Sequence, residues 1–251
     1  MPEISNLVGL AGIVVAALFL GAFTFFVRNG FKPPLRQISG YEALARLVGQ
    51  AVESGGRVHV SVGAGGLIGE ETGTTLAGLA LLEYVSKASS ISDLSPLGTT
   101  GHATTLPVLT DTIRRAYAQN GLADKFETTA ARIVAFDPMA QAGGTTAIIV
   151  DDDVRANLLV GSLGPEMALM AEAGQRQNIP QVAGSDRIQG QAVAYVMADH
   201  PLIGEEIYAS RGYLSPEPTA VASLATHDFL RWGIIAAIIG GSILGIFGLI
   251  R

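Results

Sequence analysis

The stretch Arg57–Glu71, RVHVSVGAGGLIGEE, decides the fold. Its first six residues alternate polar and apolar side chains, which predicts a β-strand. A glycine-rich turn follows, and the residues from Thr74 to Lys87 predict a helix. A strand that leads through a tight turn into a helix is the repeating unit of α/β proteins.

Helices and strands alternate on both sides of this stretch. Ser39 with Glu42 three residues later predicts a capping box at the start of a helix that Gly55 ends. Downstream we expect a helix at Leu106–Gln119 and strands at Ile133–Phe136, Asn157–Val160, Ile179–Ala183 and Ala192–Met197. Apolar strands separated by amphipathic helices predict an α/β fold, with a mostly parallel Rossmann-like sheet covered by helices on both faces.

Two segments near the ends of the chain contain no charged residue. They are Leu7–Val27, with 21 residues, and Trp232–Ile250, with 19. A helix of about 20 residues spans the hydrocarbon core of a bilayer, about 30 Å thick. The sequence therefore predicts an N-terminal transmembrane helix in residues 1–28, an α/β domain in 29–218, and a juxtamembrane helix with a second transmembrane helix in 219–251.

Basic residues flank these two segments on one side only. Arg28, Lys32 and Arg36 follow the first segment, and Arg231 precedes the second. A cleavable signal peptide would have basic residues before a shorter apolar stretch. By the positive-inside rule we expect both termini outside, the central domain in the cytoplasm, and an inner-membrane location. The basic residues would also contact anionic lipid head groups of the bilayer.

Small residues recur at four-residue spacing in both predicted spans. Ala17 and Gly21 lie in the first, and Ala237, Gly241 and Gly245 lie in the second. Such spacing lets two helix backbones approach closely, so it predicts packing of the two spans together or packing between subunits. The alternative is that membrane helices are rich in Ala and Gly for no specific contact.

The charge balance excludes several functions. The whole chain has a net charge of −6, and between Tyr41 and Asp228 there are 21 acidic and 11 basic residues. An acidic domain argues against a nucleic-acid partner, because phosphate binding depends on Lys and Arg. The chain has no cysteine, which excludes disulfides and thiolate sites.

Glycine-rich loops mark the candidate ligand site. The first loop follows a strand, where a dinucleotide fingerprint belongs, but a third glycine at that spacing would fall at Ile68. A structural tight turn is the alternative. Ligands of open α/β sheets bind at the carboxyl ends of the strands. The candidates there are Gly63, Gly65, Gly66, Gly69, His102, Asp137, Gly161, Gly164 and Asp199.

One pentapeptide, LIGEE, occurs at residues 67–71 and again at 202–206. The preceding Val58–Val62 and Val193–Met197 also correspond without a gap, which predicts the same strand, loop and helix start twice. Convergence on a good helix start and an old duplication both explain the repeat. No cofactor is expected. If the two LIGEE loops met, however, their glutamates would form an acidic cluster able to bind a divalent cation. Its members are Glu70, Glu71, Glu205 and Glu206.

The sequence contains no catalytic motif. It lacks a P-loop, a Gly-x-Ser-x-Gly elbow and a His-Glu-x-x-His pair. We therefore expect no catalytic residue and a non-enzymatic, membrane-anchored protein that assembles with itself or with a larger membrane complex. One alternative is a cytoplasmic module that senses a small molecule or nucleotide. A second is an enzyme of unknown class, for which His102, Glu70 and Glu205 would be tested first.

Four segments carry a resemblance to a known family. They are GAGGLIGEETGTTLAGLALLEY (63–84), GSLGPEMALMAEAG (161–174), IPQVAGSD (179–186) and HPLIGEEIYASRGYLS (200–215). Together they resemble a bacterial membrane-protein family catalogued only as a domain of unknown function, over most of residues 39–215. The resemblance implies an α/β domain with one or two flanking membrane spans. It implies no substrate, cofactor or catalytic residue.

Overall fold

The computed structural model describes the backbone of residues 2–246 and the side-chain surroundings of residues 6, 7 and 9–243. Contacts divide the chain into two compact units. One unit contains residues 1–35 and 215–251, and the other is the α/β domain Arg36–Leu214.

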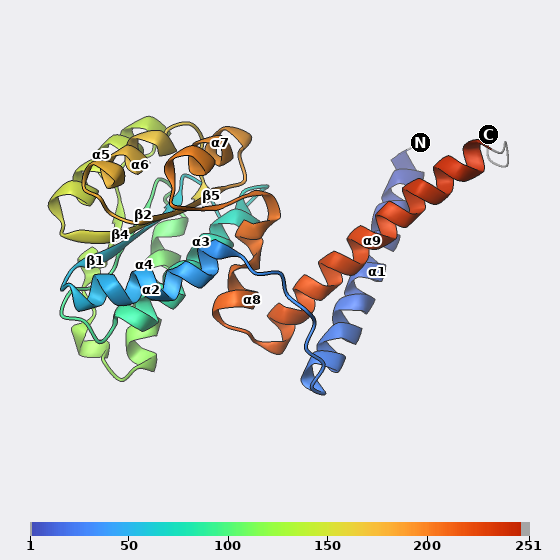
Figure 1. The fold of residues 1–251 in the computed structure, drawn as a ribbon, viewed down its shortest axis with the longest axis horizontal. Helices are drawn as coiled ribbons and strands as arrows, with labels where there is room; N and C mark the ends of the chain where they lie inside the picture. The colour runs from blue at the N-terminus through green and yellow to red at the C-terminus, as the bar shows by residue number, and fades with distance from the viewer. Residues whose placement is uncertain (1, 247–251) are drawn as a thin grey trace. The chain divides into compact units, whose positions relative to one another are not determined.

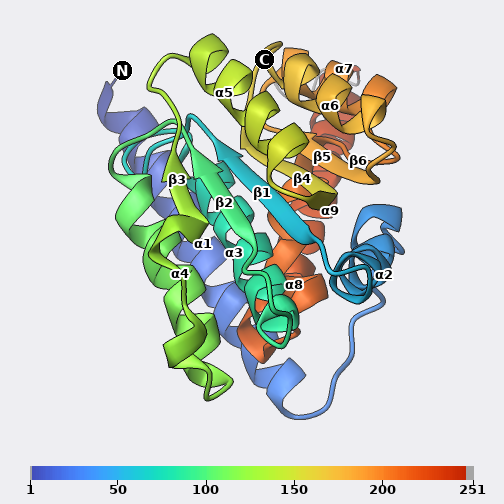
Figure 2. The ribbon, with the colours of Figure 1, turned by 90° about the vertical axis from the view of Figure 1, so that its left-hand side faces the viewer.

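The α/β domain is built on one parallel sheet. Its strands are β1 (Arg57–Gly63), β2 (Leu97–Thr100), β3 (Ala131–Ile133), β4 (Val154–Ser162), β5 (Gln181–Ser185) and β6 (His200–Leu202). In the described part of the chain all six pair in the order β3-β2-β1-β4-β5-β6 (Figure 2). This order reverses direction between β1 and β4, as in doubly wound dinucleotide-binding folds. The predicted Rossmann-like parallel sheet is confirmed.

Helices cover both faces of the sheet. Those of the domain are α2 (Ser39–Glu53), α3 (Thr72–Ser89), α4 (Thr105–Gln119), α5 (Pro138–Asp151), α6 (Met167–Arg176), α7 (Ile188–Met197) and α8 (Ser210–Leu214), with 3-10 turns η1 (Ala123–Lys125), η2 (Thr128–Ala130) and η3 (Gly204–Ala209). Helices α5, α6 and α7 form the layer on one face, and α2, α3 and α4 lie on the other (Figure 1). Because the sheet is covered twice, its central strands β1 and β4 are almost wholly buried.

Two local predictions are wrong, and a third is displaced, because the strand predicted at Ile133–Phe136 is β3 at Ala131–Ile133. Helix α2 begins at Ser39, but the residue in the capping position is Ile38, whose side chain has no hydrogen-bond acceptor. The predicted strand at Ala192–Met197 belongs to α7, and the strand on this side of the domain is the three-residue β6. A short apolar run with two valines suits either structure, and the parallel connection from β5 to β6 requires a helix there.

The two LIGEE segments are not equivalent units. Val58–Val62 lies in β1, whereas Val193–Met197 lies in α7. Residues 67–71 form a loop that ends one residue before α3, whereas Leu202 is the last residue of β6 and Gly204 begins η3. The predicted common strand, loop and helix start is therefore wrong.

A chain of hydrogen-bonded polar side chains crosses the middle of the sheet. His59 Nδ1 lies 2.8 Å from Asn157 Oδ1, and His59 Nε2 lies 2.9 Å from Thr99 Oγ1. The Asn157 amide donates to Gln181 Oε1 over 2.8 Å, and Gln181 Nε2 donates to the Ala171 carbonyl. Since Asn157 uses its nitrogen toward Gln181, its oxygen accepts the proton of His59 Nδ1. All four side chains are buried, and burial lowers the pKa of His59 to about 4.

The other unit consists of the two long helices α1 (Pro2–Arg28) and α9 (Pro218–Ile246). Gly9–Arg28 and Pro218–Ile243 are each long and apolar enough to cross a membrane. Helix α9 runs without a break from Pro218 into the apolar segment that begins at Trp232.

Aromatic side chains join α1 to α9. The ring of Phe229 lies 4.4 Å from that of Phe19 and 6.1 Å from that of Phe23, between centroids. The small residues Ala17, Gly21, Ala237 and Gly241 are exposed, and a Cβ on Gly21 or Gly241 would meet no atom within 4 Å. The surroundings of Gly245 lie outside the described residues. The small residues therefore do not form the α1–α9 contact, and their role between subunits stays a prediction.

Candidate functional site

The reversal of strand order places the candidate ligand site. Gly63, the last residue of β1, pairs with Ser162, the last residue of β4. The loops that follow these two strands therefore start side by side at the carboxyl edge of the sheet. The structure thus brings together the two groups of glycines that the sequence singled out, Gly63–Gly69 and Gly161–Gly164.

Two of these glycines allow the strands to approach closely. A Cβ on Gly63 would lie 2.3 Å from the Ser162 carbonyl oxygen, and Gly63 also has a φ of +74°. A Cβ on Gly161 would lie 2.1 Å from the Val62 carbonyl oxygen. Both positions exclude any side chain, so these glycines have a structural role whether or not a ligand binds.

His102 lies against the same loop. A Cβ on Gly66 would lie 3.1 Å from two atoms of the His102 ring. The Nδ1 atom of His102 accepts hydrogen bonds from the backbone N–H of Thr104 at 3.3 Å and pairs with its hydroxyl at 2.8 Å. Because Nδ1 accepts, the neutral ring carries its proton on Nε2. His102 is therefore held by its own loop and has one ring N–H for a further partner.

Arg187 connects the carboxyl ends of three strands through its hydrogen bonds. It was not among the residues predicted from the sequence. Its Nη2 donates to Glu71 Oε1 over 2.6 Å, and its Nε donates to Ser162 Oγ over 3.2 Å. The arginine follows β5, Ser162 ends β4, and Glu71 lies in the loop after β1. Arg187 comes four residues after the predicted strand Ile179–Ala183, so its place at the carboxyl edge was the available signal.

A second set of polar contacts closes the same edge. Thr74 Oγ1 donates to Asp186 Oδ2 over 2.9 Å and lies 3.1 Å from the hydroxyl of Tyr208. Ser185 Oγ donates to the Leu163 carbonyl over 2.6 Å and accepts from the backbone N–H of Leu163. These bonds join α3, η3 and the ends of β4 and β5. Hydrogen bonds among the domain's own residues therefore stabilise the carboxyl edge of the sheet.

The predicted acidic cluster does not form. Glu71 pairs with Arg187, and Glu206 pairs with Arg36 and accepts from the backbone N–H of Ile203. Within the described residues, no group of three or more His, Asp or Glu side chains is placed to share a metal ion. The physical reason is the strand order, because the two LIGEE segments adjoin β1 and β6, which β4 and β5 separate.

Other predicted site residues serve the backbone or lie apart from this edge. Asp137 caps α5 by accepting from the N–H of Ala140 over 3.0 Å, and Asp199 accepts from the N–H of Gln181 over 2.8 Å. Among the basic residues, Arg28 and Lys32 are exposed, Arg36 pairs with Glu206, and Arg231 lies 3.5 Å from Asp228 on α9.

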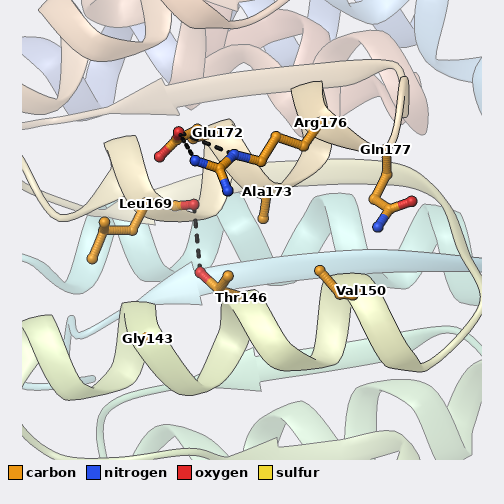
Figure 3. A pocket seen from close by; sticks show the side chains of 8 residues that line it. All are labelled: Gly143, Thr146, Val150, Leu169, Glu172, Ala173, Arg176 and Gln177. Atoms are coloured by element: carbon orange, nitrogen blue, oxygen red, sulfur yellow. Dashed lines mark hydrogen bonds and ion pairs between the residues drawn. The ribbon is translucent and has the colours of Figure 1, made fainter.

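The outer surface of the α5–α6–α7 layer is a second candidate site, which the sequence did not single out. A groove of about 420 Å³ runs between α5 and α6 (Figure 3). It is lined by Gly143, Thr146, Val150, Leu169, Glu172, Ala173, Arg176 and Gln177. Beside it, the outward side of α7 exposes Ile188, Tyr195 and Val196, each by more than two thirds.

Helix α7 and most of helix α5 also lack charged residues. Neither α7 nor the stretch 138–150 of α5 contains an acidic or basic residue. By contrast, a groove of about 410 Å³ between α3 and α4 includes four charged residues in its lining. These are Glu83, Asp111, Arg115 and Arg211.

Comparison with known proteins bears on the family only. No curated protein and no solved structure matches the chain. Residues 3–250, nearly the whole length, match the family described as "Domain of unknown function (DUF6754)". The match spans the α/β domain and both flanking apolar helices, as the resemblance of the four segments implied. The chain therefore belongs to this family, DUF6754.

Proposed function

We propose that the protein is a non-enzymatic, membrane-anchored assembly protein, whose α/β domain binds another protein surface through the α5–α6–α7 layer. The observation that carries this proposal is the outward side of α7, where Ile188, Tyr195 and Val196 are 73–79% exposed on an uncharged helix. Large apolar side chains that are exposed together on one helix are typical of a surface that binds a partner. Helix α5, on the other side of α6, also contains no charged residue over 138–150.

The assembly test uses the full chain in mild detergent. We expect wild type to have a defined mass above that of one chain. The double variant Tyr195→Lys with Val196→Lys should reduce this mass to that of a monomer, because lysines buried in an apolar interface would be desolvated. The matched control is Val108→Lys on α4, also an exposed apolar position, which should leave the mass unchanged. A monomeric wild type would contradict the proposal.

The anchoring part of the proposal places both termini outside and the α/β domain in the cytoplasm of the cell, at the inner membrane. It rests on the two apolar helices and on the basic residues that adjoin them on the domain side, Arg28, Lys32, Arg36 and Arg231. Since the chain has no cysteine, single cysteines at exposed Asn6 and Ile91 report the two sides separately. A membrane-impermeant maleimide should label Asn6→Cys in intact cells and Ile91→Cys only after permeabilisation. The opposite pattern would show the reverse orientation.

A small-molecule site at the strand ends is the second candidate. It is supported by the pairing of Gly63 with Ser162 at the reversal of strand order, where ligands of such sheets bind. An anionic ligand would compete with Glu71 for the guanidinium of Arg187. A thermal-shift series with nucleotides and divalent cations tests this idea. A ligand at 100 times its Kd would stabilise the domain by about 2.7 kcal/mol. Arg187→Gln should abolish the shift caused by a nucleotide, whereas Arg115→Gln should keep it. No shift with any compound would contradict it.

A further inference from the structure

We propose that the groove between α5 and α6 binds the same groove of a second copy of this chain, related by a two-fold axis. The inference rests on the proposed assembly function and names its partner. A two-fold interface requires that one surface be complementary to itself after a half-turn. The shape and the charge of this groove both meet that requirement.

The shape is complementary because a projection and a hollow lie two turns apart on α5. Val150 is 47% exposed, whereas a Cβ on Gly143 would meet no atom within 4 Å. Seven residues make about two helical turns, so the two positions share one side of the helix. In an antiparallel pair, Val150 of each copy would fill the space over Gly143 of the other. Thr146 lies between them on α5 (Figure 3) and would therefore lie close to the two-fold axis.

The charges of the groove are also complementary to themselves after a rotation of half a turn. Glu172 and Arg176 lie one turn apart on α6, form an ion pair of 2.7 Å, and are exposed at their side chains by 48% and 76%. When α6 of a second copy runs in the opposite direction, its Arg176 lies opposite Glu172 and its Glu172 lies opposite Arg176. The Arg176 guanidinium of each copy would therefore face the Glu172 carboxylate of the other. The rest of the lining is uncharged.

The surroundings of the groove also favour binding of a second copy. It adjoins the exposed apolar side of α7, because α6 packs against both α5 and α7. An interface that starts in the groove can therefore extend toward the area of about 800 Å² per partner that stable pairs bury. Anchoring of both copies in one membrane would raise their effective concentration.

A cysteine cross-link tests the position of the axis. The native chain has no cysteine, so Thr146→Cys in full-length protein in native membranes has no partner within its own chain, and a disulfide-linked species of twice the chain mass requires a second copy. The matched control is Thr112→Cys in the α3–α4 groove, because each hydroxyl bonds the carbonyl four residues earlier, in Ala142 and Val108. We expect disulfide-linked dimers for Thr146→Cys and none for Thr112→Cys. Equal cross-linking at both positions, or none at Thr146, would overturn the proposal.

Charge reversal provides a second and independent measurement. In the Thr146→Cys background, Glu172→Arg alone and Arg176→Glu alone should each lower the cross-linked fraction roughly tenfold, since each places like charges together in two symmetric pairs. The combination of both reversals should restore it, because opposite charges again face one another across the axis. Failure of the combination to restore cross-linking would contradict the antiparallel arrangement.

The outcomes separate this inference from the assembly function on which it rests. If wild type has a mass above one chain and loses it on Tyr195→Lys with Val196→Lys, but Thr146→Cys forms no dimer, only the α5–α6 contact is wrong. If wild type is a monomer in mild detergent and Thr146→Cys forms no dimer in membranes, both are wrong. Thermal unfolding of each variant shows that it is folded before cross-linking is scored.

Discussion

Arg187 donates from Nη2 to Oε1 of Glu71 across 2.6 Å, and the two residues are 116 positions apart in the chain. This ion pair changes the electrostatics of the loop that precedes α3. The sequence has two glutamates there and no cation nearby, which would repel an anion. In the folded domain a guanidinium from the turn after β5 neutralises one of them and also bonds Ser162.

Replacing Arg187 by Gln should lower the free energy of unfolding by about 1 kcal/mol, because it removes the ion pair and the bond to Ser162. The effect is small because the two paired side chains are 42% and 36% exposed. Arg115→Gln is the control, since Arg115 is 73% exposed and its partner Asp111 also pairs with Arg114. Thermal unfolding followed by circular dichroism measures both. An equal loss in the two variants would mean that Arg187 is only another surface residue.

The buried His59 should make the domain less stable as the pH falls from 6.5 toward 4. Its pKa is lowered to about 4 in the folded state, chiefly by burial, from 6.5 in the unfolded chain. Between these values the unfolded state binds a proton that the folded state does not, so stability rises with pH in this window. The loss approaches about 3 kcal/mol at pH 4.

His59→Gln isolates this contribution, because glutamine offers polar atoms but no titration. Unfolding midpoints of wild type and variant are compared from pH 7 to pH 5, above the range in which most carboxylates titrate. The wild type should lose more stability over this interval than the variant. Neighbouring Arg132 and Asp152 shift the pKa of His59 slightly in opposite directions and are present in both proteins. Parallel curves would show that His59 does not carry the pH dependence.

Asn157 should be the most sensitive member of the polar chain across the sheet. Asn157→Leu keeps the branched shape but leaves the Nδ1 proton of His59 and Oε1 of Gln181 without partners in a buried site. We expect a loss of about 2–4 kcal/mol, against about 1 kcal/mol for Thr99→Val, which removes a single hydroxyl. Chemical unfolding in urea gives both values. A reversed order would indicate that the chain of hydrogen bonds is not the stabilising feature.

Gly78 and Gly49 should respond in opposite ways to alanine. Gly78 lies inside α3, where a Cβ would come within 2.3 Å of the Val160 carbonyl oxygen of β4. Gly78→Ala would push the helix from the sheet and should destabilise by about 1–3 kcal/mol. At Gly49 in α2 a Cβ meets nothing within 4 Å, so Gly49→Ala should stabilise by about 0.5–1 kcal/mol. Thermal midpoints that shift in the same direction would contradict the close approach of α3.

The errors in the predicted strands have a common origin in short elements. The strand β2 was missed because Leu97–Thr100 has no run of apolar residues, and β6 was missed because it has only three residues. The segment Ala192–Met197 was predicted as a strand, although it is the end of α7. Periodicity cannot distinguish a helix from a strand over six apolar residues. In such segments the neighbouring strands decide which conformation is compatible with the sheet.

The sequence by itself determined the two apolar helices, the α/β class and the passage from β1 through a glycine turn into α3. Each depends on spacing between near neighbours, which the geometry of a helix or strand converts directly into one face or one length. Only the tertiary structure decided that the two LIGEE segments lie apart, that Glu71 meets Arg187, and that α5 and α6 enclose a groove. These relations depend on strand order, which brings distant residues together and follows from the packing of the whole domain.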